Sequence, residues 1–127
     1  MDGILDEYGE VSFEYIDELE QEKSRLKAEA EQGNIEACRL LGDLYLDSFA
    51  SYPSDDEQAV YWYTKAAEGG DKVACIRLGD IYSHCVPTVT DKRFPLSIVQ
   101  DLNKAYRYYK KAEYYKGMKR VQKQKKR

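Results

Sequence analysis

Apolar positions recur with helical spacing along the chain, and a closely similar copy of the pattern follows later in the sequence. Residues 30–46 and 67–83 share many identities at a spacing of 37 positions, among them Ala30/Ala67, Gly33/Gly70, Ala37/Ala74, Cys38/Cys75, Leu41/Leu78, Gly42/Gly79, Asp43/Asp80 and Tyr45/Tyr82. Within the first copy, Ala37, Leu41, Leu44 and Tyr45 fall at i, i+4, i+7 and i+8, which is one face of an α-helix. The chain is therefore predicted to contain an internal helical repeat.

A second pattern follows each copy. Residues 56–67 recur as residues 102–113, with Ala59 and Ala105 46 positions apart, so the second unit has nine more residues between its halves. Ala59, Trp62, Tyr63 and Ala66 again have helical spacing. Each unit is therefore predicted to be a pair of helices, with an insertion between the helices of the second pair.

Glycines mark both the ends and the interiors of these helices. Gly33 and Gly70 precede Asn34 and Asp71, which is the order of a left-handed helix end followed by an N-cap. Glycines also lie inside the first helix of each unit, where each costs about 1 kcal/mol relative to alanine. The repeated cost at Gly42 and Gly79 predicts that the partner helix approaches too closely for a side chain.

The two units resemble the Sel1-like repeat, a relative of the tetratricopeptide repeat. The matching residues of the first unit are Gly33, Ala37, Leu41, Gly42, Tyr45, Ala59, Trp62, Lys65, Ala66 and Ala67, and those of the second are Gly70, Ala74, Leu78, Gly79, Tyr82, Asp101, Ala105, Tyr108, Lys111 and Ala112. The resemblance implies an all-α fold, an α/α superhelix (solenoid) of antiparallel helix hairpins with about two repeats and flanking capping helices. Some relatives bridge their helices by disulfides, but alanines occupy the partner positions of Cys38 and Cys75, so the resemblance implies no such bridges here.

The predicted organisation has three parts. These are an acidic N-terminal segment (1–13), a repeat domain (14–115) and a basic C-terminal tail (116–127); the repeat domain holds a capping helix at 14–32, repeat 1 at 33–69, and repeat 2 at 70–115 with an inserted loop at 84–100. A capping helix is expected because repeat arrays need end units that cover their exposed apolar faces. The tail is expected to be solvated and partly disordered, with Gly117 ending or bending the preceding helix.

Charge is distributed unevenly, although the net charge is only −3. Residues 1–31 carry 11 acidic and 3 basic side chains, whereas residues 114–127 carry 7 basic and none acidic. The two ends therefore have opposite electrostatic fields. A basic tail can contact nucleic acid or an acidic protein surface, including the acidic end of another copy, through Lys119, Arg120, Lys123, Lys125, Lys126 and Arg127.

The sequence offers no recognisable catalytic or metal centre. Cys75, His84 and Cys85 suggest a metal site, but adjacent His84 and Cys85 do not have a strong zinc spacing, and Cys75 matches a core position. No phosphate-binding glycine motif is present, and a Cys–His nucleophile pair would lack an orienting third group. No metal, cofactor or enzymatic activity is therefore expected.

Several features favour the cytoplasm as the location. No apolar run approaches the roughly 18 residues that span a bilayer, and the acidic N-terminus lacks the order of a secretory signal. Three cysteines show no disulfide framework, which favours a reducing compartment.

Aromatic residues and helix faces supply the candidate contacts. Trp62 and Tyr108 are expected in the core, whereas Tyr61, Tyr63, Tyr106 and Tyr109 are expected to be half exposed and available to a partner. The predicted function is a protein–protein interaction scaffold that binds a peptide or protein on its concave helical face through Arg39, Leu40, Asp43, Ile76, Arg77 and Asp80. The alternatives are a nucleic-acid-associated protein that uses the basic tail, and an inhibitor or regulator of a partner enzyme; contact with a membrane is not expected.

Overall fold

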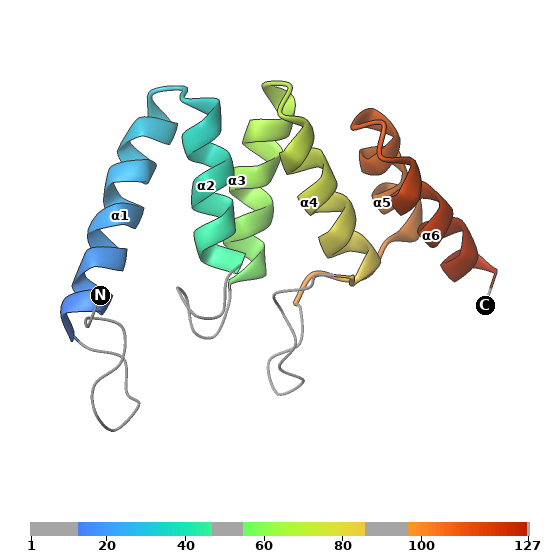
Figure 1. Ribbon diagram of the computed structural model, residues 1–127, viewed down its shortest axis with the longest axis horizontal. Helices are drawn as coiled ribbons and strands as arrows, with labels where there is room; N and C mark the ends of the chain where they lie inside the picture. The colour runs from blue at the N-terminus through green and yellow to red at the C-terminus, as the bar shows by residue number, and fades with distance from the viewer. Residues whose placement is uncertain (1–12, 47–54, 86–96, 127) are drawn as a thin grey trace.

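Six α-helices stand side by side in chain order in the computed structural model, which describes residues 13–46, 55–85 and 97–126 (Figure 1). They are α1 (Phe13–Glu31), α2 (Ile35–Leu46), α3 (Asp56–Glu68), α4 (Lys72–Ser83), α5 (Leu102–Lys111) and α6 (Tyr115–Lys125). The described residues contain no strand. The predicted all-α solenoid of helix hairpins is therefore confirmed.

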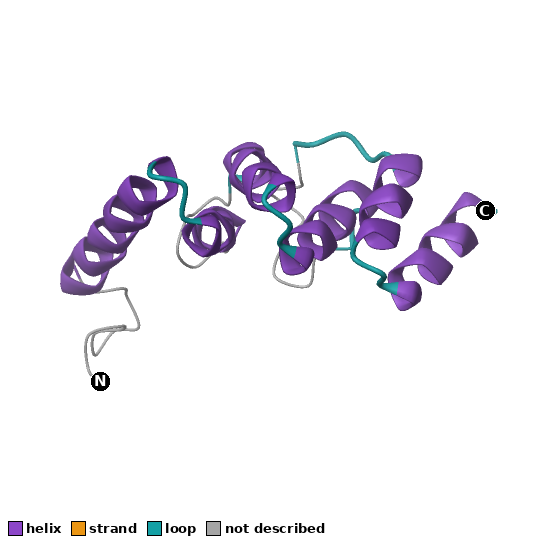
Figure 2. Cartoon of the chain, turned by 90° about the horizontal axis from the view of Figure 1, so that it is seen from above, coloured by secondary structure: helices purple, strands orange, loops and turns teal. Residues whose placement is uncertain are grey.

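The helices form two layers when viewed from above, with α3 and α5 on one side and α2, α4 and α6 on the other (Figure 2). The pairs α2–α3 and α4–α5 pack most extensively and are the two predicted hairpins. α1 packs on α2, and α6 packs on α5 and α4. The row therefore consists of two complete hairpins with one further helix at each end.

Short glycine turns connect the units. Gly33 and Gly70 have φ angles of 96° and 95°, a left-handed conformation that costs glycine little. Asn34 then accepts a hydrogen bond from Ala37 N (3.1 Å), and Asp71 accepts one from Ala74 N (3.0 Å). The helix ends and N-caps predicted from the sequence are present at both turns.

The two hairpins close in the same way despite their different loop lengths. Asp55 N donates to the Tyr45 carbonyl (2.8 Å), and Asp101 N donates to the Tyr82 carbonyl (2.9 Å). Asp55 and Asp101 also cap α3 and α5 with their side chains. The second hairpin therefore keeps the same closing hydrogen bond, although nine more residues separate Tyr82 from Asp101 than separate Tyr45 from Asp55.

A tyrosine ring covers a glycine at the centre of each hairpin. A Cβ added at Gly42 would lie 2.7 Å from the Tyr63 ring, and one added at Gly79 would lie 2.5 Å from the Tyr109 ring. Both distances are far inside van der Waals contact. The close approach predicted at these glycines is confirmed, and the partner is an aromatic side chain on the second helix.

Both tyrosines are completely buried, so the prediction that Tyr63 and Tyr109 are half exposed is wrong. Their rings fill the space that the glycines leave between the helices. Around them lie the other large buried side chains Leu26, Leu41, Leu46, Trp62, Leu78, Ile81 and Val121. Cys38 and Cys75 are buried as predicted. In each unit, the fully buried tyrosine follows directly after the position of Trp62 or Tyr108.

The basic tail also differs from its prediction, because most of it forms α6. Val121 is fully buried, and Gly117 lies within α6, where an added Cβ would be 2.7 Å from the Tyr109 ring. Glu113 takes the left-handed conformation (φ 58°) that Gly33 and Gly70 take before earlier units. α6 is therefore the first helix of an incomplete third unit, and Gly117 neither ends nor bends the preceding helix.

The described end of the inserted loop is attached to the hairpins. Asp56, which is 5% exposed, accepts hydrogen bonds from Ser97 Oγ (2.6 Å) and Ile98 N (2.8 Å). His84 Nε2 donates to the Ile98 carbonyl (2.8 Å). The acidic segment before residue 13, the middle of the loop (86–96) and Arg127 lie outside the described residues.

Replacement of Gly79 by alanine tests the ring contact. We expect Gly79→Ala to lower the free energy of unfolding by about 1–3 kcal/mol, because overpacking against Tyr109 outweighs the roughly 1 kcal/mol gained in helix propensity. Urea denaturation measures the change. The matched propensity control is Ala28→Gly on the exposed side of α1, which is expected to lose only about 1 kcal/mol. A Gly79→Ala variant more stable than the wild type would contradict the close packing.

Candidate functional site

Two charged networks occupy the face of α2, α4 and α6, and each repeats the same three residue types. In the first, the Tyr63 hydroxyl donates to Asp43, and Arg77 Nε donates to the same carboxylate at 3.4 Å. In the second, the Tyr109 hydroxyl donates to Asp80 at 2.5 Å, and Arg120 Nη2 donates to Asp80 at 3.3 Å. We call these two Asp–Tyr–Arg sets the charged ladder.

Each set of the ladder joins two successive units. The aspartate follows the glycine of a first helix, the tyrosine comes from the second helix of the same hairpin, and the arginine comes from the first helix of the next unit. Arg39 adds a further link, since its Nε lies 3.1 Å from Asp71 Oδ2 at the start of α4. The ladder therefore connects neighbouring hairpins through charge-assisted hydrogen bonds.

Burial and these hydrogen bonds change the ionisation of the ladder. Burial raises the pKa of the Tyr63 and Tyr109 phenols, and the hydrogen bonds to Asp43 and Asp80 raise it further. Burial also raises the pKa of the Asp80 carboxyl, against the opposing effects of Tyr109 and Arg120. The two phenols therefore remain protonated in the folded protein at pH values where free tyrosine ionises.

The structure brings together the six residues predicted to contact a partner. Leu40 and Ile76 are half-buried against the core, and the four charged residues are linked to one another or to neighbouring ladder residues. Side-chain exposure is 42% for Arg77 but only 14% for Asp80. The four charged side chains therefore mainly join the helices to one another, and only their exposed parts can contact a partner.

The formation of α6 separates the predicted tail contacts into exposed and inward-facing residues. Lys119, Lys123, Lys125 and Lys126 are exposed, whereas Arg120 points into the ladder. No strong sequence signal marks this division, because the third unit has neither glycine nor an N-cap side chain at its start. The spacing of 43 positions from Arg77 to Arg120 and from Leu78 to Val121 was the available signal.

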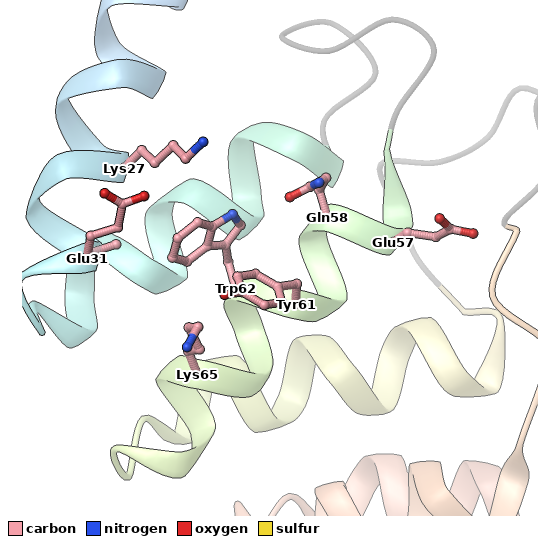
Figure 3. A pocket seen from close by; sticks show the side chains of 8 residues that line it. Lys27, Glu31, Glu57, Gln58, Tyr61, Trp62 and Lys65 are labelled. Carbon is pink, nitrogen blue, oxygen red and sulfur yellow. The ribbon is translucent and has the colours of Figure 1, made fainter.

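An open groove with a volume of about 610 Å³ lies on the other side of the row, between α1 and α3 (Figure 3). We call it the outer groove; its lining residues are Lys27, Ala30, Glu31, Glu57, Gln58, Tyr61, Trp62 and Lys65. Tyr61 is 52% exposed and meets Trp62 edge-on, with ring centroids 4.9 Å apart. The expectation of an exposed Tyr61 beside a buried Trp62 is confirmed.

Trp62, in the lining of the outer groove, has a polar atom without a hydrogen-bond partner in the described part of the chain. The side chain is 4% exposed, and its Nε1–H has no hydrogen-bond partner within the described part of the chain. Figure 3 shows the indole nitrogen on the side of Lys27 and Gln58. An unpaired buried donor costs about 1–3 kcal/mol. An oxygen acceptor that reached it from the groove would recover part of that cost.

The residues of the next unit that are equivalent to the α3 lining of the outer groove are mostly cationic. A smaller groove of about 320 Å³ is lined by Lys104, Arg107, Tyr108 and Lys111. These residues correspond to Gln58, Tyr61, Trp62 and Lys65 at the 46-residue spacing. Tyr108 is half-buried and stacks on Tyr82 with ring centroids 6.0 Å apart. The repeat thus builds two equivalent grooves with different charge.

The described residues form no group of three potential metal ligands from His, Cys, Asp and Glu. None of the described helices is long and apolar enough to span a membrane. Cys38, Cys75 and Cys85 are free thiols.

Comparison with known proteins finds one family. A family model described as Sel1 repeat matches residues 35–71 and 96–113, which cover the first hairpin and the second helix of the next one. The search of curated proteins and the search of solved structures found no match. α4 lies outside the matched residues, but its glycine, aspartate and leucine occupy the same structural positions as those of α2.

The buried phenols predict a loss of stability in alkali. Their pKa is raised in the folded state, so their contribution to stability is complete below about pH 10 and is lost as the pH rises above that value. We expect Tyr109→Phe to reduce the slope of unfolding free energy against pH by up to about 1.4 kcal/mol per pH unit. Denaturation between pH 9 and roughly pH 12 measures it.

The control for this measurement is Tyr61→Phe, because Tyr61 is exposed. We expect it to leave the alkaline slope as in the wild type. Equal slopes for the Tyr109→Phe variant and the wild type would contradict a protonated Tyr109 in the ladder.

Proposed function

Since the chain is a Sel1-like repeat protein, we propose that it is a non-catalytic scaffold that holds a peptide segment of a protein partner in its outer groove. Sel1 repeats generally mediate protein–protein interactions. The observation that carries the proposal is the outer groove itself, in which a half-exposed tyrosine lies against a buried tryptophan with an unpaired donor.

The shape and lining of the groove favour a peptide. It lies between two helices and is open to solvent, which suits an extended or helical segment. Tyr61 provides an aromatic surface with few internal degrees of freedom, which is typical of side chains that dominate binding energy. Lys65 lies 5.1 Å from the Tyr61 ring centroid and limits its motion.

Polar groups around the aromatic pair define the partner's chemistry. Lys27 and Lys65 are cationic, Glu31 and Glu57 are anionic, and Trp62 Nε1 requires an acceptor. A peptide segment fits this lining if it places an apolar side chain against Tyr61 and a carbonyl or carboxylate oxygen beside the indole nitrogen. It would also carry charges of both signs next to these groups. The mixture favours a polypeptide over a polyanion such as nucleic acid.

The face of α2 and α4 is the second surface in this proposal. Leu40 and Ile76 lie half-buried between ladder charges that are already held in position. Rigid charges need little further ordering when a partner binds. The partner is therefore proposed to contact Arg39, Leu40, Asp43, Ile76, Arg77 and Asp80 through their exposed parts. The free thiols support the reducing cytoplasm as the proposed location.

Peptide selection tests the groove directly. Peptides selected from a random library on the full chain are expected to bind at least about tenfold more weakly to Tyr61→Ala, because that variant loses an aromatic anchor. Trp62 is the only tryptophan, so its fluorescence reports occupation of the groove.

The matched control is Tyr115→Ala, which removes another exposed tyrosine, on α6, and is expected to leave peptide affinity unchanged. Selected peptides that bind both variants as tightly as the wild type, with no change in Trp62 fluorescence, would rule out the groove.

A further inference from the structure

The layer formed by α3 and α5 (Figure 2) carries a groove at each helix, and the two grooves differ in charge. α3 contains three acidic residues and one basic residue, whereas α5 contains four basic residues and no acidic one. The groove on α5 is lined by Lys104, Arg107, Tyr108 and Lys111, and we call it the basic groove. Their spacing of i, i+3, i+4 and i+7 places them on one face of the helix. The charge of this layer therefore changes from negative on α3 to positive on α5.

The three cations of the basic groove form no ion pair with another described residue. The two acidic residues that flank α5 have other contacts. Asp101 caps the helix by accepting a hydrogen bond from Lys104 N (3.0 Å), and Glu113 Oε1 lies 4.0 Å from Lys72 Nζ at the start of α4. The charge of the basic groove is therefore available to anions that a partner supplies.

These cations are spread along α5 rather than gathered at one point. Lys104 is seven residues from Lys111, which corresponds to about 10 Å along a helix. Lys104 Nζ lies 4.7 Å from the Tyr82 ring centroid on α4, whereas Arg107 and Lys111 are exposed. Side chains on one side of an extended peptide repeat about every 6.7 Å. The spread therefore suits successive carboxylates of an acidic peptide better than a single phosphate group.

The aromatic rings beside the basic groove pack on one another. Tyr108 is half-buried and stacks on Tyr82 with an interplanar angle of 9°. Lys104 also covers the Tyr82 ring. Single-stranded nucleic acids bind where a cationic groove is combined with exposed aromatic rings on which bases stack. The basic groove combines its cations with little exposed aromatic surface, which favours an acidic peptide over a nucleic acid.

We propose that the basic groove binds an acidic stretch of the same peptide that the outer groove holds. The inference rests on the proposed function and adds the charge of the partner. One part of the bound segment contacts Tyr61, and an acidic part lies along α5, where Arg107 and Lys111 donate charge-assisted hydrogen bonds to its carboxylates. One segment can reach both grooves because they occupy equivalent positions on neighbouring helices of one layer.

Binding of fluorescein-labelled hexaglutamate to the full chain tests the basic groove independently of the outer groove. Fluorescence anisotropy is expected to show binding that weakens with salt, because exposed charges are screened over about 10 Å at 0.1 M ionic strength and about 3 Å at 1 M. Arg107→Glu with Lys111→Glu is expected to bind at least about tenfold more weakly, because attraction becomes repulsion. Tyr61→Ala is expected to bind hexaglutamate like the wild type, and labelled hexaglutamine is expected not to bind.

The matched control is Lys119→Glu with Lys123→Glu, which makes the same charge change at two exposed residues of α6. This variant is expected to bind hexaglutamate like the wild type, because α6 belongs to the other layer (Figure 2). Circular dichroism checks that every variant keeps its helices.

An extended peptide tests whether one partner occupies both grooves. Three glutamates are joined to either end of a peptide selected on the outer groove, through flexible glycine–serine linkers. At least one of these peptides is expected to bind at least about tenfold more tightly than the same peptide extended with glutamines. The gain is expected to be lost in the variant with Arg107→Glu and Lys111→Glu, while the change in Trp62 fluorescence persists.

Four results would overturn the proposal. The first is equal binding of hexaglutamate by the wild type and the α5 variant, and the second is equal weakening by the α6 control. The third is tighter binding of hexauridylate or of inorganic phosphate than of hexaglutamate at the same groove, which would assign it to nucleic acid or to a phosphate group. The fourth is a glutamate extension without any gain in affinity. None of these results changes the comparison between Tyr61→Ala and the wild type, so failure here is distinguishable from failure of the outer groove.

Discussion

The contact between a buried tyrosine ring and a helical glycine governs the rest of this structure. Tyr63 over Gly42 and Tyr109 over Gly79 bring two helices closer than a side chain would allow. The cost of glycine in a helix, about 1 kcal/mol each, is offset by burial of a whole aromatic ring, which contributes about 1.5–3 kcal/mol. The same geometry places each phenol beside the aspartate that follows the glycine.

That placement links the packing of one hairpin to its neighbour. A tyrosine hydroxyl already bound to Asp43 or Asp80 fixes the carboxylate at the edge of the hairpin, where Arg77 or Arg120 of the next unit reaches it. The row of helices is therefore held by apolar contacts within hairpins and by charge-assisted hydrogen bonds between them. Because Tyr63 points inward, the adjacent Trp62 and Tyr61 form the wall of the outer groove.

The sequence was sufficient for the fold because the repeated residues have separate local roles. Gly33 and Gly70 end helices, Asn34 and Asp71 cap helices, and Gly42 and Gly79 allow close packing, and each role can be recognised from residue type and spacing. The helical state of the basic tail was missed because Glu113 and Tyr114 replace the glycine and the capping residue of earlier units. The burial of Tyr63 and Tyr109 was missed because adjacent aromatic residues do not show which one faces inward.

The site was less predictable than the fold for a physical reason. Arg39, Asp43, Arg77 and Asp80 were recognised as polar positions off the apolar stripe, but their pairing depends on how the hairpins stack. The outer groove combines α1 with α3, which are separated by a full helix along the chain. Trp62 was predicted in the core, yet its unpaired nitrogen becomes evident only when the surrounding side chains are in place.

Proton NMR of the full chain tests the ring-on-glycine contact most directly. We expect nuclear Overhauser effects from the Gly42 α-protons to the Tyr63 ring and from the Gly79 α-protons to the Tyr109 ring, together with ring-current shifts of both glycines. Glycine α-protons at random-coil positions, without cross-peaks to either ring, would contradict this contact.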